Sequence, residues 1–356
     1  MTGVRLPETE AVLAVRRGVR QWVAARGGRG PVVVGLSGGA DSLALVAASV
    51  VEAGAVTAVV VDHQLQEGSA AVAARAAEQA RALGCVEAVV VPVTVGRAGG
   101  VEAAARAARY AALAAVRAGR PVLLGHTLDD QAETVLLGLA RGSGGRSIQG
   151  MAAWNAPWGR PLLGVRRART VAMCADLGIE PWHDPHNTDP RYTRVRVREE
   201  VLPLLEQVLG GGVAQALGRT ADQLREDGAV LDALALELVA RARDRTPTST
   251  GDRAASAGPF GPDGPGDSGA DDNSRATISI EILATAPPAL RRRAVRAWLT
   301  DLGITGLMNA HLQAIDELVS NWRGQGPVAV GGGTRAQRLV VTRERGTLAV
   351  RAQPRI

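Results

Sequence analysis

The residues best suited to chemistry lie in the stretch 32–42, which reads VVVGLSGGADS. Its three consecutive valines predict a buried strand, and the Ala/Leu-rich residues after it predict a helix. The turn between them and the first helical residues are Ser37, Gly38, Gly39, Ala40, Asp41 and Ser42. Adjacent glycines let backbone N–H groups converge, and the positive end of the helix dipole points to the same place. We therefore interpret the turn as a phosphate-binding loop, with the two serine hydroxyls as further donors.

The sequence of this loop excludes two common nucleotide-binding motifs. A Walker A loop needs a lysine after its last glycine, and all 41 basic residues of this chain are arginines. The G-x-G-x-x-G fingerprint of a Rossmann fold is also absent from the turn. The remaining pattern, S-G-G-x-D-S, resembles the PP-loop of ATP pyrophosphatases, which cleave ATP between its α and β phosphates and pass AMP to a substrate oxygen. The alternative is a tight strand–helix turn that is rich in glycine for structural reasons alone.

A second group of polar residues occupies the stretch 126–134, HTLDDQAET. His126 ends a predicted strand, and Asp129 and Asp130 fall in the first turn of the helix that follows. Glu133 comes three residues after Asp130, so these two carboxylates share one helix face. Carboxylates beside a phosphate loop can hold Mg²⁺ or bind a cationic amine. Acidic residues in a first helical turn are also ordinary partners of the helix dipole, and that interpretation stays open.

Strands and helices alternate along the first 125 residues, which predicts an α/β fold with a parallel sheet flanked by helices. The predicted elements are a leading helix at 8–26, strands from 32 and at 55–61, 86–95 and 122–125, and helices at 41–53, 69–84 and 100–119. Ligands of such sheets bind beyond the carboxyl ends of the strands. Ser37, Asp62 and His126 each follow such an end, so we expect them to share one crevice.

The length of 356 residues allows two domains, which we place at 1–210 and 211–356. The second is predicted to be mainly helical, with short terminal strands. Its composition collapses to Gly, Pro, Ser, Thr and Asp at 244–276, which predicts a disordered linker or loop. The other elements expected there are helices at 212–243, 290–302 and 309–322, and strands at 328–330, 339–341 and 348–350.

The net charge of +6 favours a polyanionic partner, and nucleic acid is the first candidate. From the charge alone, a protein that is basic without any such partner is an equally good interpretation. Ten arginines fall between residues 141 and 205, a density that suits contacts with a phosphate backbone. For the stretch 166–169, a solvated helix face is an equally good explanation. Trp154 and Trp158 could stack on an unpaired base, but such tryptophans are more often core or loop anchors.

Cysteines and apolar runs limit the class of protein further. Cys85 and Cys174 lie far apart and form no C-x-x-C pair, so the sequence indicates no disulfide framework, zinc site or iron–sulfur site. The first residues, MTGVRLPETE, lack the apolar core of a signal peptide. The sequence holds no apolar run long enough to span a bilayer. We therefore expect a cytoplasmic protein without a membrane partner.

Taken together, the motifs resemble those of the tRNA(Ile)-lysidine synthetase family. They are S-G-G-x-D-S, the pair Asp62-His63, the helix with Glu102, Arg106, Arg109 and Tyr110, H-T-x-D-D-x-x-E-T, Arg141-Gly142, Arg160-Pro161-Leu162-Leu163, DPHN at 184–187, Asp189, Arg194 and Arg198. The likeness is dense from residue 32 to 205 and loose in the C-terminal half. The chain departs from the pattern at Val195, where the family commonly has asparagine.

This resemblance implies a two-step reaction with ATP and Mg²⁺ as cofactors and L-lysine and an isoleucine tRNA with a CAU anticodon as partners. The wobble cytidine is adenylylated with release of pyrophosphate, and lysine then displaces AMP at carbon 2 to give lysidine. The catalytic residues implied are Asp41, Asp130, Glu133, His126, Arg109 and Arg141. Those implied for the nucleotide are Ser37, Gly38, Gly39, Ala40, Asp41, Ser42, Asp62 and His63, with Asp41 and Asp130 as metal ligands.

Two alternatives come from other classes of function. Another PP-loop enzyme that modifies tRNA, such as a thiolase, commonly needs cysteines near the loop or in pairs, which this chain lacks. A non-catalytic, nucleotide-dependent RNA-binding protein would bind ATP without releasing pyrophosphate, and it has no need of a second group of carboxylates. The sequence is compatible with a homodimer, but it does not identify the residues that select the tRNA.

Overall fold

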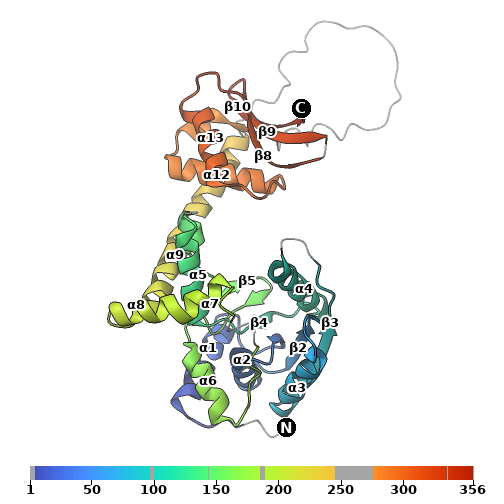
Figure 1. Cartoon of the computed structure of the whole chain (residues 1–356). Coiled ribbons are helices and arrows are strands. Elements are labelled where there is room, and N and C mark those ends of the chain that lie inside the picture. Colours follow the sequence, from blue (N-terminus) through green and yellow to red (C-terminus); the bar gives the residue numbers. More distant parts are fainter. Residues whose placement is uncertain are drawn as a thin grey trace, which may run out of the picture. The chain divides into compact units, whose positions relative to one another are not determined.

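The computed structural model describes residues 5–96, 100–142, 144–184, 189–244, 276–334 and 336–355. The chain divides into two compact units, Met1–Gln223 and Leu224–Ile356. Each unit has its own hydrophobic core. Figure 1 shows the helices and strands of both units, coloured along the sequence. The predicted linker falls on the segment 245–275, which lies outside the described residues. The assignment of separate functions to 1–210 and 211–356 stays a prediction.

The first unit has the predicted α/β fold, which is confirmed. Its sheet has the order β3-β2-β1-β4-β6-β5, in which β5 alone runs antiparallel to its neighbour. The strands are β1 (Val32–Leu36), β2 (Val56–Asp62), β3 (Glu87–Pro92), β4 (Val122–Leu124), β5 (Trp154–Asn155) and β6 (Trp158–Gly159). The helices between the strands are α2 (Ala40–Glu52), α3 (Ser69–Ala82) and α4 (Val101–Val116), with α1 (Glu10–Ala24) in front and α5 (Leu128–Ala140) after β4.

Alternation along β1 explains why helices cover both faces of the sheet. Val32 and Val34 belong to a core that is shared with α1, α2, α3 and α6 (Arg167–Asp176). Val33 points the other way and packs with Leu113 of α4. At Gly35 a Cβ would lie 3.2 Å from a side-chain carbon of Leu124 and 3.3 Å from one of Leu113. The absence of a side chain there therefore lets α4 approach the sheet closely.

The short hairpin of β5 and β6, which was not predicted, carries Trp154 and Trp158. Trp154 packs edge-on against Trp22, with ring centroids 5.7 Å apart. Trp158 packs edge-on against Tyr110 of α4 at 4.5 Å. Both tryptophans therefore anchor the hairpin to helices of the same unit, as the packing interpretation of their sequence expects.

The helices that follow the hairpin bring arginines back to the sheet. After α6 come α7 (Thr193–Arg196), a π-helical turn at Val197–Val201 and α8 (Leu202–Val208). The helices α1, α2 and α6 pack against one another, and the π-helical turn packs against α5. The long helix α9 (Val213–Asp244) begins in the first unit and continues into the second.

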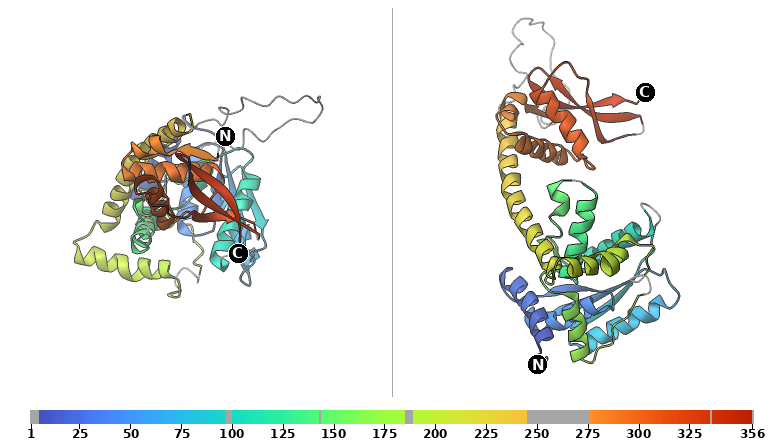
Figure 2. Two further views of the ribbon diagram at one scale, coloured as in Figure 1. Left: turned by 90° about the horizontal axis from the view of Figure 1, so that it is seen from above. Right: turned by 60° about the vertical axis from the view of Figure 1, so that its left-hand side comes forward.

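The second unit combines helices with a four-stranded antiparallel sheet of order β7-β10-β9-β8. Its elements are β7 (Thr277–Ser279), α11 (Ile280–Ala284), α12 (Pro288–Asp301), α13 (Asn309–Ser320), β8 (Val328–Gly333), β9 (Gln337–Glu344) and β10 (Thr347–Pro354). Both views of Figure 2 show α12 and α13, in orange, beside these red strands. The buried Trp298 of α12 lies in their common core. Among the helices of the described residues, none combines the length and apolar character that a membrane crossing requires.

Candidate active site

The predicted phosphate loop connects β1 to α2 at the carboxyl edge of the sheet. Gly38 has φ +82°, a left-handed conformation that glycine adopts without strain. The hydroxyl of Ser42 accepts the N–H of Ser37 at 3.2 Å and donates to the carbonyl of Gly39 at 2.9 Å. Ser42 therefore closes the loop on itself, whereas the sequence suggested it as a donor to phosphate. The turn leaves the N-terminus of α2 at its mouth, a site that favours anions.

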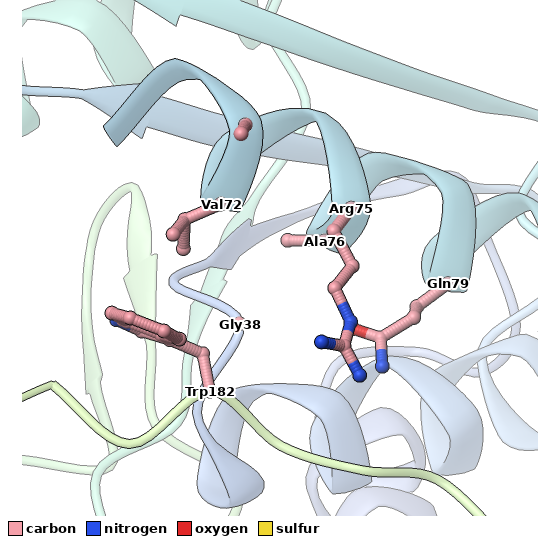
Figure 3. A pocket seen from close by; sticks show the side chains of 7 residues that line it. Gly38, Val72, Arg75, Ala76, Gln79 and Trp182 are labelled. Atoms are coloured by element: carbon pink, nitrogen blue, oxygen red, sulfur yellow. The ribbon is translucent and has the colours of Figure 1, made fainter. Parts of the chain in front are cut away.

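A segment near residue 182 supports this loop from the side of α3. The N–H of Trp182 donates to the carbonyl of Gly38 at 2.9 Å. Figure 3 shows the indole of Trp182 across from Val72, with Arg75 and Gln79 at the other end of a small pocket. Its volume of about 190 Å³ is below the roughly 300 Å³ of ordinary ligand pockets. We interpret the residues around this pocket as a structural support of the phosphate loop. The contact of Trp182 with the loop was not predicted.

Asp41 lies in the first turn of α2, directly after the loop, and contacts α6. Its Oδ2 atom lies 3.0 Å from Nε of Arg167, and its Oδ1 atom accepts the hydroxyl of Thr170. Burial raises the pKa of Asp41, and the charge of Arg167 opposes this effect. Two long-range contacts therefore hold the carboxylate beside the phosphate loop.

Asp130 is held by the first turn of α5. Its Oδ2 atom accepts both the N–H and the hydroxyl of Thr127 at 2.8 Å, which completes a capping box. Its Oδ1 atom lies 2.9 Å from Nη2 of Arg167. Burial opposes ionisation of Asp130, but the Arg167 charge and the Thr127 hydrogen bonds lower its pKa to about 2. The environments of Asp41 and Asp130 therefore shift their pKa values in opposite directions.

Glu133 is the most deeply buried carboxylate of the site, since none of its side chain is exposed to solvent. Oε2 lies 2.7 Å from Nε of Arg194, and Oε1 lies 2.7 Å from Nε of Arg198. A second bond joins Nη2 of Arg198 to Oε2 at 3.1 Å. Arg167 approaches the same carboxylate at 3.6 Å. Three carboxylates and three guanidiniums thus form one cluster, which we call the ion cluster: Asp41, Asp130, Glu133, Arg167, Arg194 and Arg198.

Next to Asp130 lies a group of buried nitrogens. In the described part of the chain, Nδ1 of His63, Nδ1 of His126 and Nε of Arg109 are buried and lack a hydrogen-bond partner. Burial lowers the pKa of His126 to about 3, with the charge of Arg109 among the minor causes. Burial and the charge of Arg109 also lower the pKa of His63. Both imidazoles are therefore neutral near pH 7, and the group offers polar atoms to a ligand.

Two of the predicted residues have other surroundings. Asp62 is buried at the end of β2 and accepts the N–H of Gln64 at 3.0 Å, so it shapes the turn that carries His63. Arg141 is exposed and follows α5 at its C-terminus. Eleven residues separate Arg141 from Asp130, or about 16 Å along the helix. The structure therefore does not bring Arg141 into the ion cluster, and its role stays a prediction.

The predicted metal ligands, Asp41 and Asp130, do not fit Mg²⁺ in this arrangement. All four of their oxygens accept hydrogen bonds from protein donors, and Arg167 bridges the two side chains. Within the described ranges, no group of three or more histidines, cysteines and acidic residues is arranged to hold a metal. The place between the two carboxylates is taken by a guanidinium.

Comparisons with known proteins decide the family. Residues 14–205 match the model of the PP-loop domain, and residues 278–349 match that of the TilS substrate binding domain. The chain is 61% identical over 343 residues to the tRNA(Ile)-lysidine synthase of Nocardia farcinica, covering 96% of this chain and 98% of that one. It is 57% identical to that of Rhodococcus erythropolis, covering 96% of each.

The chain belongs to the tRNA(Ile)-lysidine synthase family. The resemblance that its motifs indicated is confirmed. Among solved structures, the U34-tRNA thiolase NcsA from Methanococcus maripaludis matches 61% of this chain and 80% of its own with a TM-score of 0.50. At 17% identity this likeness is one of fold, and it agrees with the PP-loop architecture.

Sequence reasoning missed two residues of this synthase-family site, Arg167 and Thr170. The neighbouring arginines explain why Arg167 was missed. Arg166 pairs with Asp129 and Arg169 pairs with Glu10, so the stretch does resemble a surface helix face. The available signal was electrostatic, because three carboxylates buried at one edge require cations in contact with them.

Proposed function

We propose that the chain ligates lysine to carbon 2 of the wobble cytidine in the CAU anticodon of an isoleucine tRNA. ATP activates the cytidine by forming an adenylylated intermediate, and the products are lysidine, AMP and pyrophosphate. The observation that carries the proposal is the meeting of a phosphate loop with buried carboxylates at one sheet edge. It occurs in a chain 61% identical to a tRNA(Ile)-lysidine synthase over nearly its full length.

The first step needs charge stabilisation where pyrophosphate leaves. The carbonyl oxygen of the cytidine attacks the α-phosphorus, and the bond to the bridging oxygen of pyrophosphate breaks. The backbone N–H of Gly38 and the N-terminus of α2 are suited to these oxygens. Arg109 adds a buried positive charge with an unpartnered Nε among the described residues. We assign Arg109, His63 and His126 to the nucleotide and the activated base.

The second step needs a site for a lysine ammonium and an acceptor for its proton. The amine nitrogen forms a bond to carbon 2, and the bond from that carbon to the adenylate oxygen breaks with AMP as leaving group. Asp41 is the stronger candidate for the acceptor, because burial raises its pKa. Asp130 stays ionised and can pair with the ammonium. Glu133 contributes by holding Arg194 and Arg198 at the site.

We assign the catalytic role to residues 1–210 and the holding of tRNA to residues 211–356. The match of residues 278–349 to the TilS substrate binding domain supports the second assignment. The substrates, which are ATP, free lysine and a tRNA, favour the cytoplasm as its location. We expect Mg²⁺ to act bound to the phosphates of ATP, because Asp41 and Asp130, the two predicted ligands of the metal, contact Arg167.

Sulfur transfer is disfavoured by the surroundings of the two cysteines. Cys174 is buried in α6 and Cys85 is half-buried after α3. Burial raises the pKa of each thiol to about 11, so neither is a thiolate near pH 7. A chemistry that needs a reactive cysteine pair therefore lacks its groups here.

A pyrophosphate-release assay tests the function. The full chain is given ATP, L-lysine and a transcript of an isoleucine tRNA with a CAU anticodon. Without lysine, release is expected to stop after at most one pyrophosphate per tRNA, because the adenylylated intermediate is not consumed, so continued turnover should require both lysine and tRNA. Release should be absent when the wobble cytidine is replaced by uridine. Asp130→Asn is expected to lower lysine incorporation at least tenfold, because it removes one carboxylate charge facing the amine. The proposal fails if wild-type turnover does not require both substrates.

A further inference from the structure

Arg167 differs from the other two arginines of the ion cluster in the number of carboxylates that it contacts. It is the first residue of α6, and its guanidinium lies 3.0 Å from Asp41, 2.9 Å from Asp130 and 3.6 Å from Glu133. Among the ion pairs of the described residues, it is the one cation that reaches all three carboxylates. It also joins the helix behind the phosphate loop to α5, which carries the other two acids.

Every carboxylate oxygen of Asp41 and Asp130 already accepts a hydrogen bond from the protein. Oδ1 of Asp41 accepts the Thr170 hydroxyl, and Oδ2 of Asp130 accepts two bonds from Thr127. The remaining oxygen of each carboxylate accepts one N–H of Arg167. Arg167 lies between the two carboxylates, so an ammonium that pairs with both from the same position takes the place of this guanidinium.

The other two arginines of the cluster are held differently. Arg198 makes two hydrogen bonds to Glu133 and Arg194 makes one of 2.7 Å, all to a carboxylate that is fully buried. Removing either would leave that buried charge short of a partner, which is costly. Arg167 makes one hydrogen bond each to Asp41, whose side chain is 23% exposed, and to the buried Asp130, and 24% of its own side chain is exposed. Its departure frees Oδ2 of Asp41, leaves Oδ1 of Asp130 with Arg198 at 3.6 Å, and leaves Glu133 paired with Arg194 and Arg198.

We propose that the guanidinium of Arg167 stands in for the substrate's ε-ammonium, and that lysine binds by displacing it from Asp41 and Asp130. The inference rests on the proposed function and names a residue that regulates entry to its lysine site. One cation replaces another, so neither aspartate becomes an unpaired buried charge during the exchange. An ammonium offers three N–H donors, enough for the two freed oxygens. The apparent affinity for lysine is then the intrinsic affinity multiplied by the fraction of molecules in which Arg167 has left.

Lysine binding to Arg167→Gln tests the displacement. Radiolabelled L-lysine is dialysed to equilibrium against the full-length protein at pH 8, with ATP and tRNA omitted. Removing the competing cation is expected to lower the Kd for lysine at least tenfold. The matched control is Arg169→Gln, which removes the same charge from the same helix where the arginine pairs with Glu10. Its Kd is expected to equal that of the wild type.

A second variant keeps the positive charge. In Arg167→Lys the tethered ammonium ends about where the carbon of the guanidinium lies, so it is expected to hold the two oxygens less tightly than the fork of Arg167 does. The Kd of this variant should fall between those of the wild type and Arg167→Gln. In the complete reaction with cognate tRNA, the KM for lysine should fall in the same order, whatever happens to kcat.

The outcomes separate this inference from the proposed function. A Kd for lysine that is unchanged or higher in Arg167→Gln, or higher than wild type in Arg167→Lys, would mean that Arg167 anchors the aspartates and is not displaced. A wild-type protein whose multiple-turnover pyrophosphate release does not depend on lysine would overturn the function itself. A tenfold fall in Kd shared by Arg169→Gln would assign the effect to general charge and overturn the displacement.

Discussion

Replacing Glu133 by glutamine should destabilise the first unit strongly, although the two side chains have nearly the same shape. The wild-type carboxylate accepts three charge-assisted hydrogen bonds from Arg194 and Arg198, at 2.7, 2.7 and 3.1 Å. Glutamine has one acceptor oxygen, and its amide hydrogens face a guanidinium. The substitution therefore leaves at least one arginine donor without an acceptor inside the fold.

The size of the effect follows from burial. Breaking a buried ion pair by removing one charge costs about 3–5 kcal/mol. The lower end applies here, because 36% of the Arg194 side chain and 23% of the Arg198 side chain remain exposed and can regain water. We therefore expect a loss of about 3 kcal/mol in the free energy of unfolding. For a unit of this size, that corresponds to a fall in Tm of about 6–12 °C.

Scanning calorimetry of wild type and variant measures this fall. The matched control is Glu200→Gln, because Glu200 pairs with Arg196 in the same helical region but at 53% exposure. An exposed pair contributes little, so this variant is expected to unfold at the wild-type midpoint. A Glu133→Gln midpoint within about 2 °C of wild type, or an equal fall in Glu200→Gln, would refute burial as the source of the stabilisation.

Two further changes probe the loop and the buried histidine. In Gly125→Ala the new Cβ would lie 3.0 Å from the carbonyl oxygen of Asp41, so we expect the KM for ATP to rise on the order of tenfold. The control is Gly164→Ala, where no atom lies within 4 Å of the added carbon, and this variant should keep the wild-type KM. Burial lowers the pKa of His126 from 6.5 to about 3, so between these values only the unfolded chain binds the proton and stability falls as the pH drops. Between pH 7 and pH 5 the urea-unfolding free energy of His126→Asn should fall less steeply with decreasing pH than that of the wild type. The two slopes should differ by at most about 1.4 kcal/mol per pH unit, and equal slopes would contradict this prediction.

The sequence was enough to predict those parts of the site that depend on local order. A loop after a valine-rich strand and a helix start after it are neighbours in the chain, so Ser37 and Gly38 could be assigned from spacing alone. The parallel sheet then implied that His126, some 90 residues on, would reach the same edge. Both expectations needed only the period of the strands and the rule that ligands bind at their carboxyl ends.

The contacts of the ion cluster could not be predicted in this way. Arg167 is 126 residues from Asp41, and which of four neighbouring residues faces the acids depends on the rotation of α6. That rotation is set by packing of α6 against α1 and α2, a tertiary property. In the sequence the arginines of this stretch are equivalent neighbours, whereas the structure separates Arg167 from Arg166 and Arg169 by their partners.

The charge balance of the ion cluster links the stability of the free protein to its choice of substrate. Three bare carboxylates at one buried edge would repel one another or bind protons, and the three guanidiniums prevent both. In the exchange proposed for lysine, this neutral site takes up one cation and releases another, so no excess of positive charge results. Exchange at Asp41 and Asp130 favours an amine that donates to both carboxylates at once and disfavours one that reaches only one of them. The interaction free energy of a substrate amine with the two aspartates would thus have to exceed that of Arg167, whose contacts stabilise the fold without substrate.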